Sequence, residues 1–281
     1  MAAILIKALT ALVVLISVPI ALAELCIIVV GLWTLFHWPK GAGKMIKIEN
    51  AEVMGWEHAI RGMRNPLNSW DKMDSHACPC HDGLDCDCPM VENGHEPAIE
   101  CNETIEKSAF CVGENDYDLM MRLAKAGPQH AKYRRMIVVY ADVTAPRYWW
   151  AEYDTYKVGT VANSCSTMHK VTAKQFDLQD FSHEHLTIAS SVALQEVIYN
   201  LNYWRAKYDA AETEEIKKEC WWQIIQMLPS SYNQRRTLML NYEVPANIYK
   251  QRKNHKLDEW RQFCSWASSL PYSELITGKE A

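Results

Sequence analysis

The stretch of sequence that decides the fold covers residues 142–170 and reads DVTAPRYWWAEYDTYKVGTVANSCSTMHK. After an apolar start, Pro146 opens a short aromatic helix over residues 145–156, since the missing amide of a proline costs nothing in a first turn. A loop of small hydroxyl and amide side chains follows, with Asn163, Ser164, Ser166 and Thr167. Such a loop at the end of a helix suits the binding of phosphates or a planar cofactor, and it equally suits a surface turn.

Strands are expected early in the chain and helices later. The Ile-, Val- and Tyr-rich run over residues 133–143 predicts a strand, and residues 45–48 read like a first strand. Apolar spacing predicts further helices over residues 116–126, 185–207, 213–227, 236–252 and 257–270. Pro245 should kink or break the helix over residues 236–252. This order indicates an α+β domain with a helical C-terminal half.

The composition is that of a globular protein with a substantial core. The 281 residues are 49% apolar and 22% charged, which is enough for one large domain or two small ones. The net charge of -5 argues against a dedicated nucleic-acid binder, because no dominant basic face would attract phosphates. The pairs Trp149-Trp150 and Trp221-Trp222 are interpreted as core or subunit-interface rings rather than as platforms for a flavin.

Residues 1–44 form an apolar segment that precedes this domain. A membrane-spanning helix needs about 20 apolar residues, and this segment nearly supplies one. It also reads as a signal peptide, with Lys7 as the charged region and a cleavage site after Ala23. We favour an anchor, because the apolar run resumes over residues 25–35, which a cleaved signal does not need. A third reading places the natural start at Met45.

Three lysines follow the apolar segment: Lys40, Lys44 and Lys47. By the positive-inside tendency, they predict that the domain over residues 45–281 is cytoplasmic, anchored to the membrane through residues 1–44.

A cysteine-rich insertion is expected at about residues 76–111. It contains a C-x-C…C-x-C array of four thiols: Cys78, Cys80, Cys86 and Cys88. Four thiolates in so short a loop could close tetrahedrally on zinc, although the spacing is tighter than in a usual C-x-x-C knuckle. The alternatives are disulfides, if the segment is exported, and a variable insertion with chance cysteines.

The order of features over residues 46–266 resembles the flavin-dependent thymidylate synthases. In that family a His-containing turn precedes a strand, and a helix ends in R-H-R-x-x-S-x-N-E-x-S-x-R-Y. Here the turn carries His130, and Thr155-Tyr156-Lys157 stands in place of R-H-R. The C-terminal helices of the family carry T-x-N and later arginines, which Thr237…Asn241 and Arg252 match.

The resemblance implies specific roles for seven residues. Thr160 stands for the first motif serine, Ser166 for the second, and Arg252 for a substrate-side arginine, so these three are the catalytic candidates. The cofactor-binding candidates are His130, Lys157, Asn163 and Asn241. Each also has an ordinary structural reading, such as bracing a turn, ending a helix or forming part of a solvated basic face.

Several positions depart from the family pattern. Lys157 is the only cation left of R-H-R, Ser164 replaces a glutamate, Met168-His169 replaces R-Y, and Glu243 stands where an arginine is usual. Arginine grips phosphate with a planar fork, whereas lysine offers a point charge. Either other basic residues substitute, or the ligand differs; the candidates are Arg134, Arg135, Arg147, Arg235 and Arg236.

As implied by the resemblance, the fold is a mixed sheet flanked by helices. The implied activity is FAD-dependent transfer of a methylene group from folate to deoxyuridylate (dUMP to dTMP), with reduced flavin as hydride donor. NADPH and methylenetetrahydrofolate would be co-substrates, and a homo-oligomer, specifically a tetramer, is expected. The alternative is a non-catalytic nucleotide-binding or assembly protein that kept the scaffold and lost the chemistry.

Overall fold

The computed structural model describes residues 45–77 and 110–278 of the chain. Of these, residues 184–194, which include the start of the helix over residues 188–209, belong to one compact unit, and the remainder form a second unit. The sheet, the core and the candidate site described below lie in the second unit. The expected apolar anchor over residues 1–44 and the cysteines of the predicted zinc site lie outside the described residues. Within the two described ranges, no helix combines the length and the apolar character that crossing a membrane requires.

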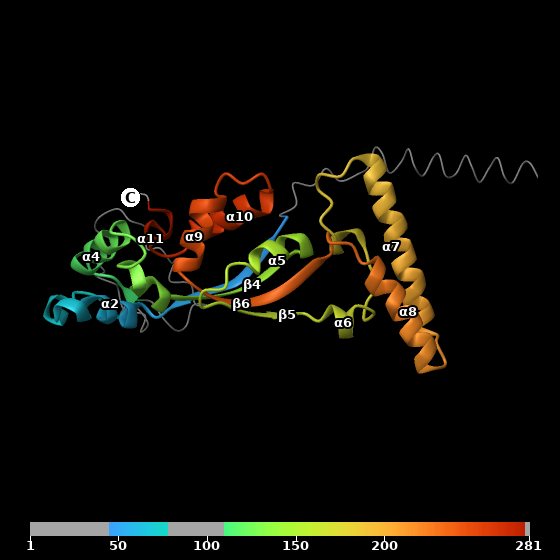
Figure 1. Cartoon of the computed structure of the whole chain (residues 1–281), viewed down its shortest axis with the longest axis horizontal. Helices are drawn as coiled ribbons and strands as arrows, with labels where there is room; N and C mark the ends of the chain where they lie inside the picture. Colours follow the sequence, from blue (N-terminus) through green and yellow to red (C-terminus); the bar gives the residue numbers. More distant parts are fainter. Residues whose placement is uncertain (1–44, 78–109, 279–281) are drawn as a thin grey trace, which may run out of the picture. The chain divides into compact units, whose positions relative to one another are not determined.

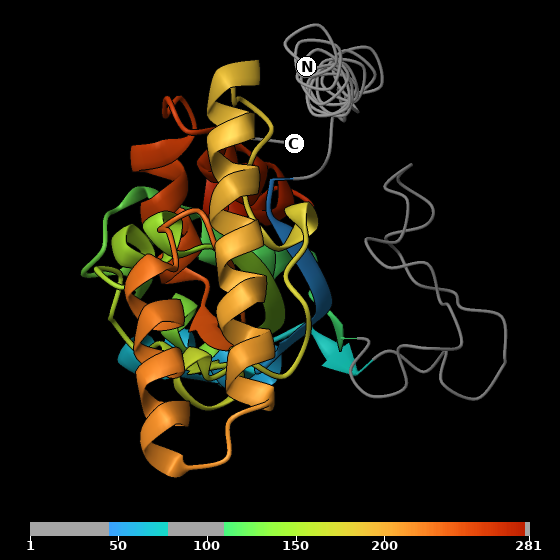
Figure 2. The same ribbon diagram turned by 90° about the vertical axis from the view of Figure 1, so that its right-hand side faces the viewer.

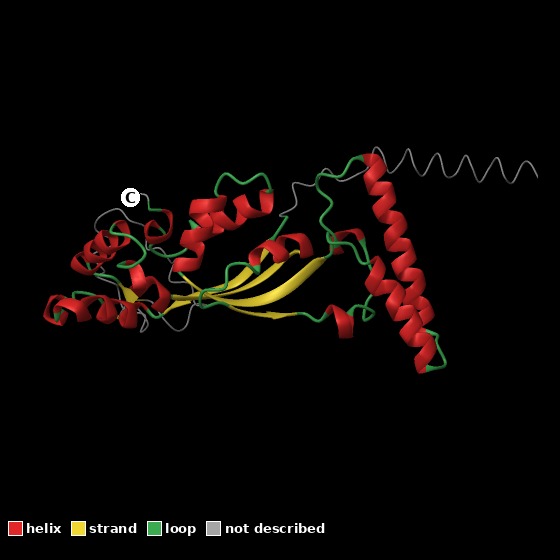
Figure 3. Cartoon of the chain, in the orientation of Figure 1, coloured by secondary structure: helices red, strands yellow, loops and turns green. Residues whose placement is uncertain are grey.

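A four-stranded sheet in the order β1-β4-β6-β5 forms the centre of the second unit (Figure 1, Figure 3). Its strands are β1 (Lys47–Met54), β4 (Val138–Pro146), β5 (Val161–Ser164) and β6 (Asn233–Asn241). All three pairings are antiparallel, where the resemblance implied a mixed sheet. The two central strands, β4 and β6, are paired along their full length from Val138↔Asn241 to Pro146↔Asn233.

One face of the sheet is buried because β4 alternates apolar and polar residues. Its inward side chains are Val139, Ala141, Val143 and Ala145, all at most 1% exposed. Successive side chains of a strand point to opposite faces, so this pattern buries one face and leaves the other open. The expected α+β architecture with a helical C-terminal half is confirmed.

Aromatic rings fill the core between the sheet and the helices α5 (Arg147–Tyr153), α9 (Glu243–Arg252) and α10 (Asp258–Ala267). Trp149 stacks on Tyr153 with ring centroids 5.1 Å apart and lies 4.7 Å from Trp260. Both tryptophans are fully buried. The interpretation of Trp149 and its neighbour as core rings is confirmed.

A short two-stranded ladder borders the cysteine-rich insertion. Strands β2 (His76–Ala77) and β3 (Phe110–Cys111) pair His76↔Cys111 and Ala77↔Phe110. They connect to α2 (Trp56–Arg64) through the 3-10 turns η1 (Asn65–Leu67) and η2 (Trp70–Lys72), and to α4 (Glu114–Lys125). The helix predicted over residues 116–126 is therefore confirmed within two residues.

The helices predicted over residues 185–207 and 213–227 form a hairpin. They are α7 (Ile188–Asp209) and α8 (Glu214–Met227), which run side by side in both views (Figure 1, Figure 2). Thr213 caps α8 by accepting a hydrogen bond from the Ile216 amide. The remaining short elements are η4 (Ala131–Met136), α6 (Thr167–Lys170), η5 (Leu178–Asp180) and α11 (Glu274–Thr277).

Two predictions of secondary structure are wrong in part. The helix expected over residues 236–252 is a strand followed by a helix, because Leu238 and Leu240 alternate with exposed or half-buried neighbours and pack under the sheet. Pro245 lies in the first turn of α9, where it breaks nothing. Likewise the strand expected over residues 133–143 begins as the 3-10 helix η4, and the expected hydroxyl loop contains the edge strand β5.

Candidate functional site

The turn over residues 157–160 is held against the end of β6. Asn241 is 4% exposed, and its Nδ2 donates to the carbonyls of Val158 and Gly159 at 3.1 and 3.5 Å. Gly159 has φ +70°, and a Cβ there would lie 2.8 Å from Asn241 Nδ2. The Thr160 hydroxyl donates to the Tyr156 carbonyl at 3.0 Å. The turn is thus fixed by hydrogen bonds, and the side chain of Lys157, its first residue, is exposed to solvent.

Arg252, at the end of α9, reaches the same turn through a side-chain network. Its Nε donates to the Tyr156 hydroxyl at 3.0 Å, and its Nη1 lies 3.0 Å from Glu152 Oε2 and 2.8 Å from His255 Nε2. The guanidinium stacks over Trp260, with Cζ 5.0 Å from the ring centroid. The Nε and Nη1 groups of Arg252 are therefore already bound to other side chains of the protein.

The start of α9 adds a second ion pair next to Asn241. The Asn241 Oδ1 accepts from the Glu243 amide at 3.1 Å, and the Glu243 carboxylate pairs with Arg135 of η4. Side-chain hydrogen bonding to Glu243 raises the pKa of the Arg135 guanidinium. The Glu243 carboxylate thus binds a basic residue of η4.

A polar cluster occupies the open face of the sheet. Asp142 accepts from the Thr237 hydroxyl at 2.5 Å, from Asn50 Nδ2 at 2.8 Å and from Arg235 Nη2 at 2.8 Å. These hydrogen bonds hold the pKa of Asp142 well below its usual range. Asn163 of β5 is paired in register with Thr237, so it lies on the same face as this cluster.

The structure brings together four of the seven predicted site residues. Lys157, Thr160, Asn241 and Arg252 surround the turn over residues 157–160 and its contacts. Asn163 is exposed on the edge strand β5, and Ser166, beyond the end of that strand, caps α6 by accepting from the His169 amide at 3.2 Å. His130 precedes η4 and is exposed.

Most arginines that the structure describes are paired with carboxylates. The pairs are Arg61–Glu57, Arg64–Asp116, Arg135–Glu243, Arg205–Asp209, Arg235–Asp142, Arg236–Asp154, Arg252–Glu152 and Arg261–Asp258. Within the described residues, Arg122, Arg134 and Arg147 have no carboxylate partner. Of the five arginines expected to substitute for R-H-R, only Arg134 and Arg147 therefore keep an unneutralised charge.

A buried carboxylate was missed by the sequence interpretation. Glu259 of α10 is 3% exposed and accepts a hydrogen bond from the Tyr148 hydroxyl, which also lies 3.0 Å from Ser182 Oγ. A glutamate in a first helical turn reads as an ordinary surface residue, so nothing in the sequence marks it as buried.

No group of metal-binding side chains occurs within residues 45–77 and 110–278, and the predicted zinc ligands lie outside these ranges.

Comparisons with solved structures identify the fold. Thymidylate synthase X (ThyX) from Helicobacter pylori, crystallised with FAD and dUMP, matches with a TM-score of 0.52 and 11% sequence identity over 83% of this chain and 95% of that chain. A second structure of the flavin-dependent thymidylate synthase from Helicobacter pylori, complexed with FAD and dUMP, matches with a TM-score of 0.50 and 12% identity, over 82% of this chain and 97% of that chain. No protein-family model and no curated protein sequence matches the chain. The chain therefore shares the ThyX fold.

Three predicted site residues have side chains without a partner among the described residues. Lys157 and His130 are exposed and, like the Asn163 amide, form no side-chain hydrogen bond or ion pair with other described residues. A cation and an amide are the groups that hold a phosphate and the edge of a heterocycle. Because Asn241 holds the backbone that carries Lys157, this cation is placed by the fold rather than by a mobile loop.

Proposed function

We propose that the chain is a divergent flavin-dependent thymidylate synthase-like enzyme that binds FAD and a pyrimidine deoxynucleotide. The observation that carries this proposal is the shared fold, which extends over 83% of this chain and 95% of a neighbour crystallised with FAD and dUMP. A fold alone does not specify a reaction, so the proposal also rests on Lys157, the unpaired cation at the start of the braced turn over residues 157–160.

In this proposal five of the seven predicted site residues have a stated task. Lys157 attracts a phosphate, Asn163 contacts a heterocycle edge, and the hydroxyls of Thr160 and Ser166, which lie before and after the edge strand β5, are near the substrate. Arg252 acts through Tyr156, which it holds by a hydrogen bond of 3.0 Å, and thereby positions the turn. Bound reduced flavin would supply the hydride for the methyl group, with NADPH and methylenetetrahydrofolate as co-substrates.

A second function is favoured by a specific observation, namely the neutralised arginines. Arg135, Arg235, Arg236 and Arg252 all bind carboxylates, so their forks are not free for phosphate. A non-catalytic nucleotide-binding or assembly protein on the same scaffold would tolerate this loss, because it needs less charge stabilisation than a reacting nucleotide does.

One experiment separates the two functions. The purified full chain is titrated with FAD and then with dUMP while the flavin absorbance near 450 nm is followed, and dTMP formation is measured with NADPH and methylenetetrahydrofolate. A flavin spectrum that shifts on adding dUMP, together with turnover, supports the enzyme. Nucleotide binding without turnover identifies the scaffold protein, and a chain that binds neither ligand excludes both functions.

The Lys157→Ala variant tests the site itself. Loss of a charge-assisted contact to phosphate should weaken ligand binding about tenfold, or by ~1.4 kcal/mol. The matched control is Lys218→Ala, which removes another exposed lysine, on α8, and should leave binding unchanged. Equal effects of both substitutions would mean that only overall charge matters.

A further inference from the structure

A basic surface lies at the end of α9 and in the connection that leads to α10. It consists of three exposed lysines, Lys250, Lys253 and Lys256, which we call the lysine surface. Residues 244–257 include no aspartate or glutamate, and none of the three lysines forms an ion pair with a described carboxylate. Cations in a last helical turn favour the helix dipole, but Lys256 lies beyond the helix, so the dipole does not account for the whole surface. In a chain with a net charge of -5, this is a local excess of positive charge.

The lysine surface faces away from the candidate functional site. The Tyr156 hydroxyl donates to Gln251 Oε1 at 2.9 Å and accepts from Arg252 Nε at 3.0 Å, so these two residues of α9 are directed toward the site. Successive residues of an α-helix are about 100° apart around its axis, which places Lys250 and Lys253 on the opposite side of α9. A partner that covers the lysine surface therefore leaves the candidate site open.

The chain enters the domain next to this surface. The apolar segment that the sequence predicts as a membrane anchor lies outside the described residues and ends directly before them. Ile46 is 3% exposed, and its amide donates to Gln262 Oε1 of α10 at 3.1 Å. The preceding residue, Arg261, donates through Nη1 to the carbonyl of His255 at 2.8 Å, one residue before Lys256. Two successive residues of α10 thus connect the point of entry with the lysine surface.

We propose that the lysine surface docks onto an anionic lipid bilayer. Several lysines next to a membrane anchor attract the acidic headgroups of a bilayer. One apolar signal and one basic signal together hold a protein on a membrane more firmly than either does alone. Lysine suits mobile headgroups, because its compact ammonium on a flexible stem needs no fixed bidentate geometry. Each lysine at such a surface strengthens binding about fivefold.

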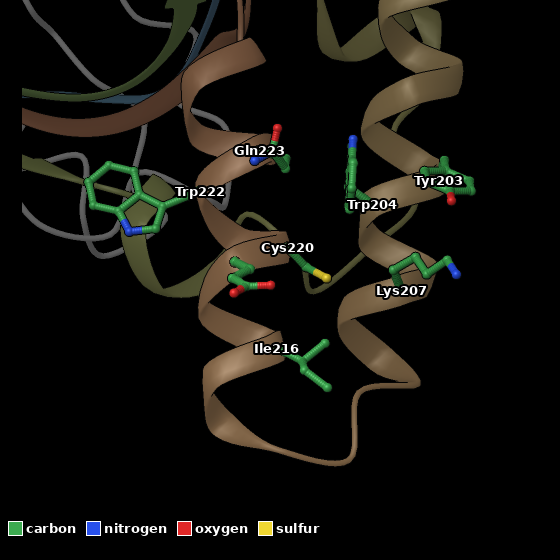
Figure 4. Close-up of a pocket in the computed structure, with 8 residues that line it drawn as sticks. Tyr203, Trp204, Lys207, Ile216, Cys220, Trp222 and Gln223 are labelled. Atoms are coloured by element: carbon green, nitrogen blue, oxygen red, sulfur yellow. The ribbon is translucent and has the colours of Figure 1, made fainter.

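Vesicle binding tests this assignment in the full chain. Co-sedimentation is measured with vesicles of phosphatidylcholine alone and with vesicles that contain about a third phosphatidylglycerol. The double variant Lys253→Gln, Lys256→Gln should bind the anionic vesicles about 25-fold more weakly. The matched control is Lys207→Gln, Lys218→Gln, which changes the net charge equally and should bind like wild type. Lys207 lines the hollow between α7 and α8 and lies over a tyrosine ring at 5.6 Å, as Lys253 does at 5.7 Å (Figure 4).

A second measurement locates the contact on the chain. An apolar segment inserts into neutral and anionic vesicles alike, so binding alone does not show which residues touch the lipid. Acetylation by an amine-reactive ester, followed by mass spectrometry, reports on each lysine separately. Lys250, Lys253 and Lys256 should react more slowly on anionic than on neutral vesicles, whereas Lys207 and Lys218 should react at the same rate on both.

Protection of the lysine surface on anionic vesicles, together with binding that weakens as salt is added, supports the proposal. Four results would overturn it: no binding to anionic vesicles, equal weakening by the two double variants, equal acetylation on both kinds of vesicle, or binding of a single-stranded oligonucleotide in place of vesicles. None of these results depends on flavin or nucleotide, so the proposed function can fail separately.

Discussion

A buried ion pair fixes the point where the chain enters and leaves the cysteine-rich insertion. Asp116 is fully buried and accepts from Arg64 Nε at 2.6 Å, from the Ser75 hydroxyl at 2.6 Å and from the amides of Ser75 and Asp74 at 3.0 and 3.1 Å. Arg64 is itself only 4% exposed. One carboxylate thus joins α2, the segment before β2 and the first turn of α4.

Replacing Asp116 by alanine should therefore destabilise the protein strongly. The substitution leaves Arg64 buried without its counter-charge and orphans the hydrogen-bond donors of Ser75, and the expected loss in the free energy of unfolding is about 3–5 kcal/mol. Urea unfolding followed by tryptophan fluorescence measures it. Asp118→Ala, on the exposed face of the same helix, should cost less than about 0.5 kcal/mol. Similar losses in both variants would contradict the role given to the ion pair.

The roles given to the individual site residues remain predictions, because only the family motif suggested them. Lys157, Thr160, Asn241 and Arg252 lie around one turn, but the actual contacts of Arg252 were not foreseeable from the sequence. Its partner Glu152 lies a hundred residues earlier, and no local pattern links the two. Pairing between distant charged residues depends on tertiary structure, which is why the neutralised arginines became visible only in the folded chain.

Among the elements, helices were predicted better than strands. The two long helices α7 and α8 lie within three residues of their expected bounds, since their spacing and caps are local signals. Strand β6, which includes Arg235, Arg236 and Thr237, is followed by a real helix, α9, with only Tyr242 between the two elements. For this reason the strand was mistaken for the beginning of that helix. Its strand character derives from pairing with β4 on one side and β5 on the other, and those partners are distant in sequence.

Asp142 links β1, β4 and β6 on the open face of the sheet, and this makes stability depend on pH. Its pKa is lower in the folded chain than the ordinary value of 3.8 because of hydrogen bonds from Thr237, Asn50 and Arg235. A carboxyl group with a depressed pKa stabilises the folded chain at pH values above its pKa in the unfolded chain. This stabilisation is lost as the pH falls through its pKa in the folded chain. The difference in unfolding free energy between wild type and Asp142→Asn should thus be constant above about pH 5 and shrink steadily below pH 3.8.

Urea titrations at several pH values between about 2 and 7, the range in which carboxyl groups titrate, check this expectation. Asp71→Asn is the matched control, because Asp71 is exposed in η2 and forms no hydrogen bond or ion pair within the described chain. Its difference from wild type should be small at every pH. A difference for Asp142→Asn that does not change with pH would mean that the cluster acts through packing alone.

In the domain of ThyX fold, the two segments that flank residues 78–109, where the cysteine-rich insertion is predicted, are joined to each other. Ala77 and Phe110 are opposite one another in the β2–β3 ladder, and Asp74 accepts hydrogen bonds from the amides of Asn115 and Asp116 at 2.9 and 3.1 Å. The residues on both sides of the insertion are therefore held by the domain itself. A connection between paired residues can be shortened to a two-residue hairpin without moving either strand.

Replacing residues 78–109 with Asn-Gly should consequently leave the domain folded. The unfolding free energy should remain within about 1 kcal/mol of wild type, because a shorter loop costs less closure entropy and no described core residue is removed. Urea unfolding and the near-ultraviolet circular dichroism of the buried tryptophans test this, and a loss of the cooperative transition would contradict it.

Elemental analysis of the same two proteins tests the zinc prediction for Cys78, Cys80, Cys86 and Cys88. Stoichiometric zinc in the full chain that disappears from the shortened one is expected, whereas equal zinc in both would place the metal elsewhere.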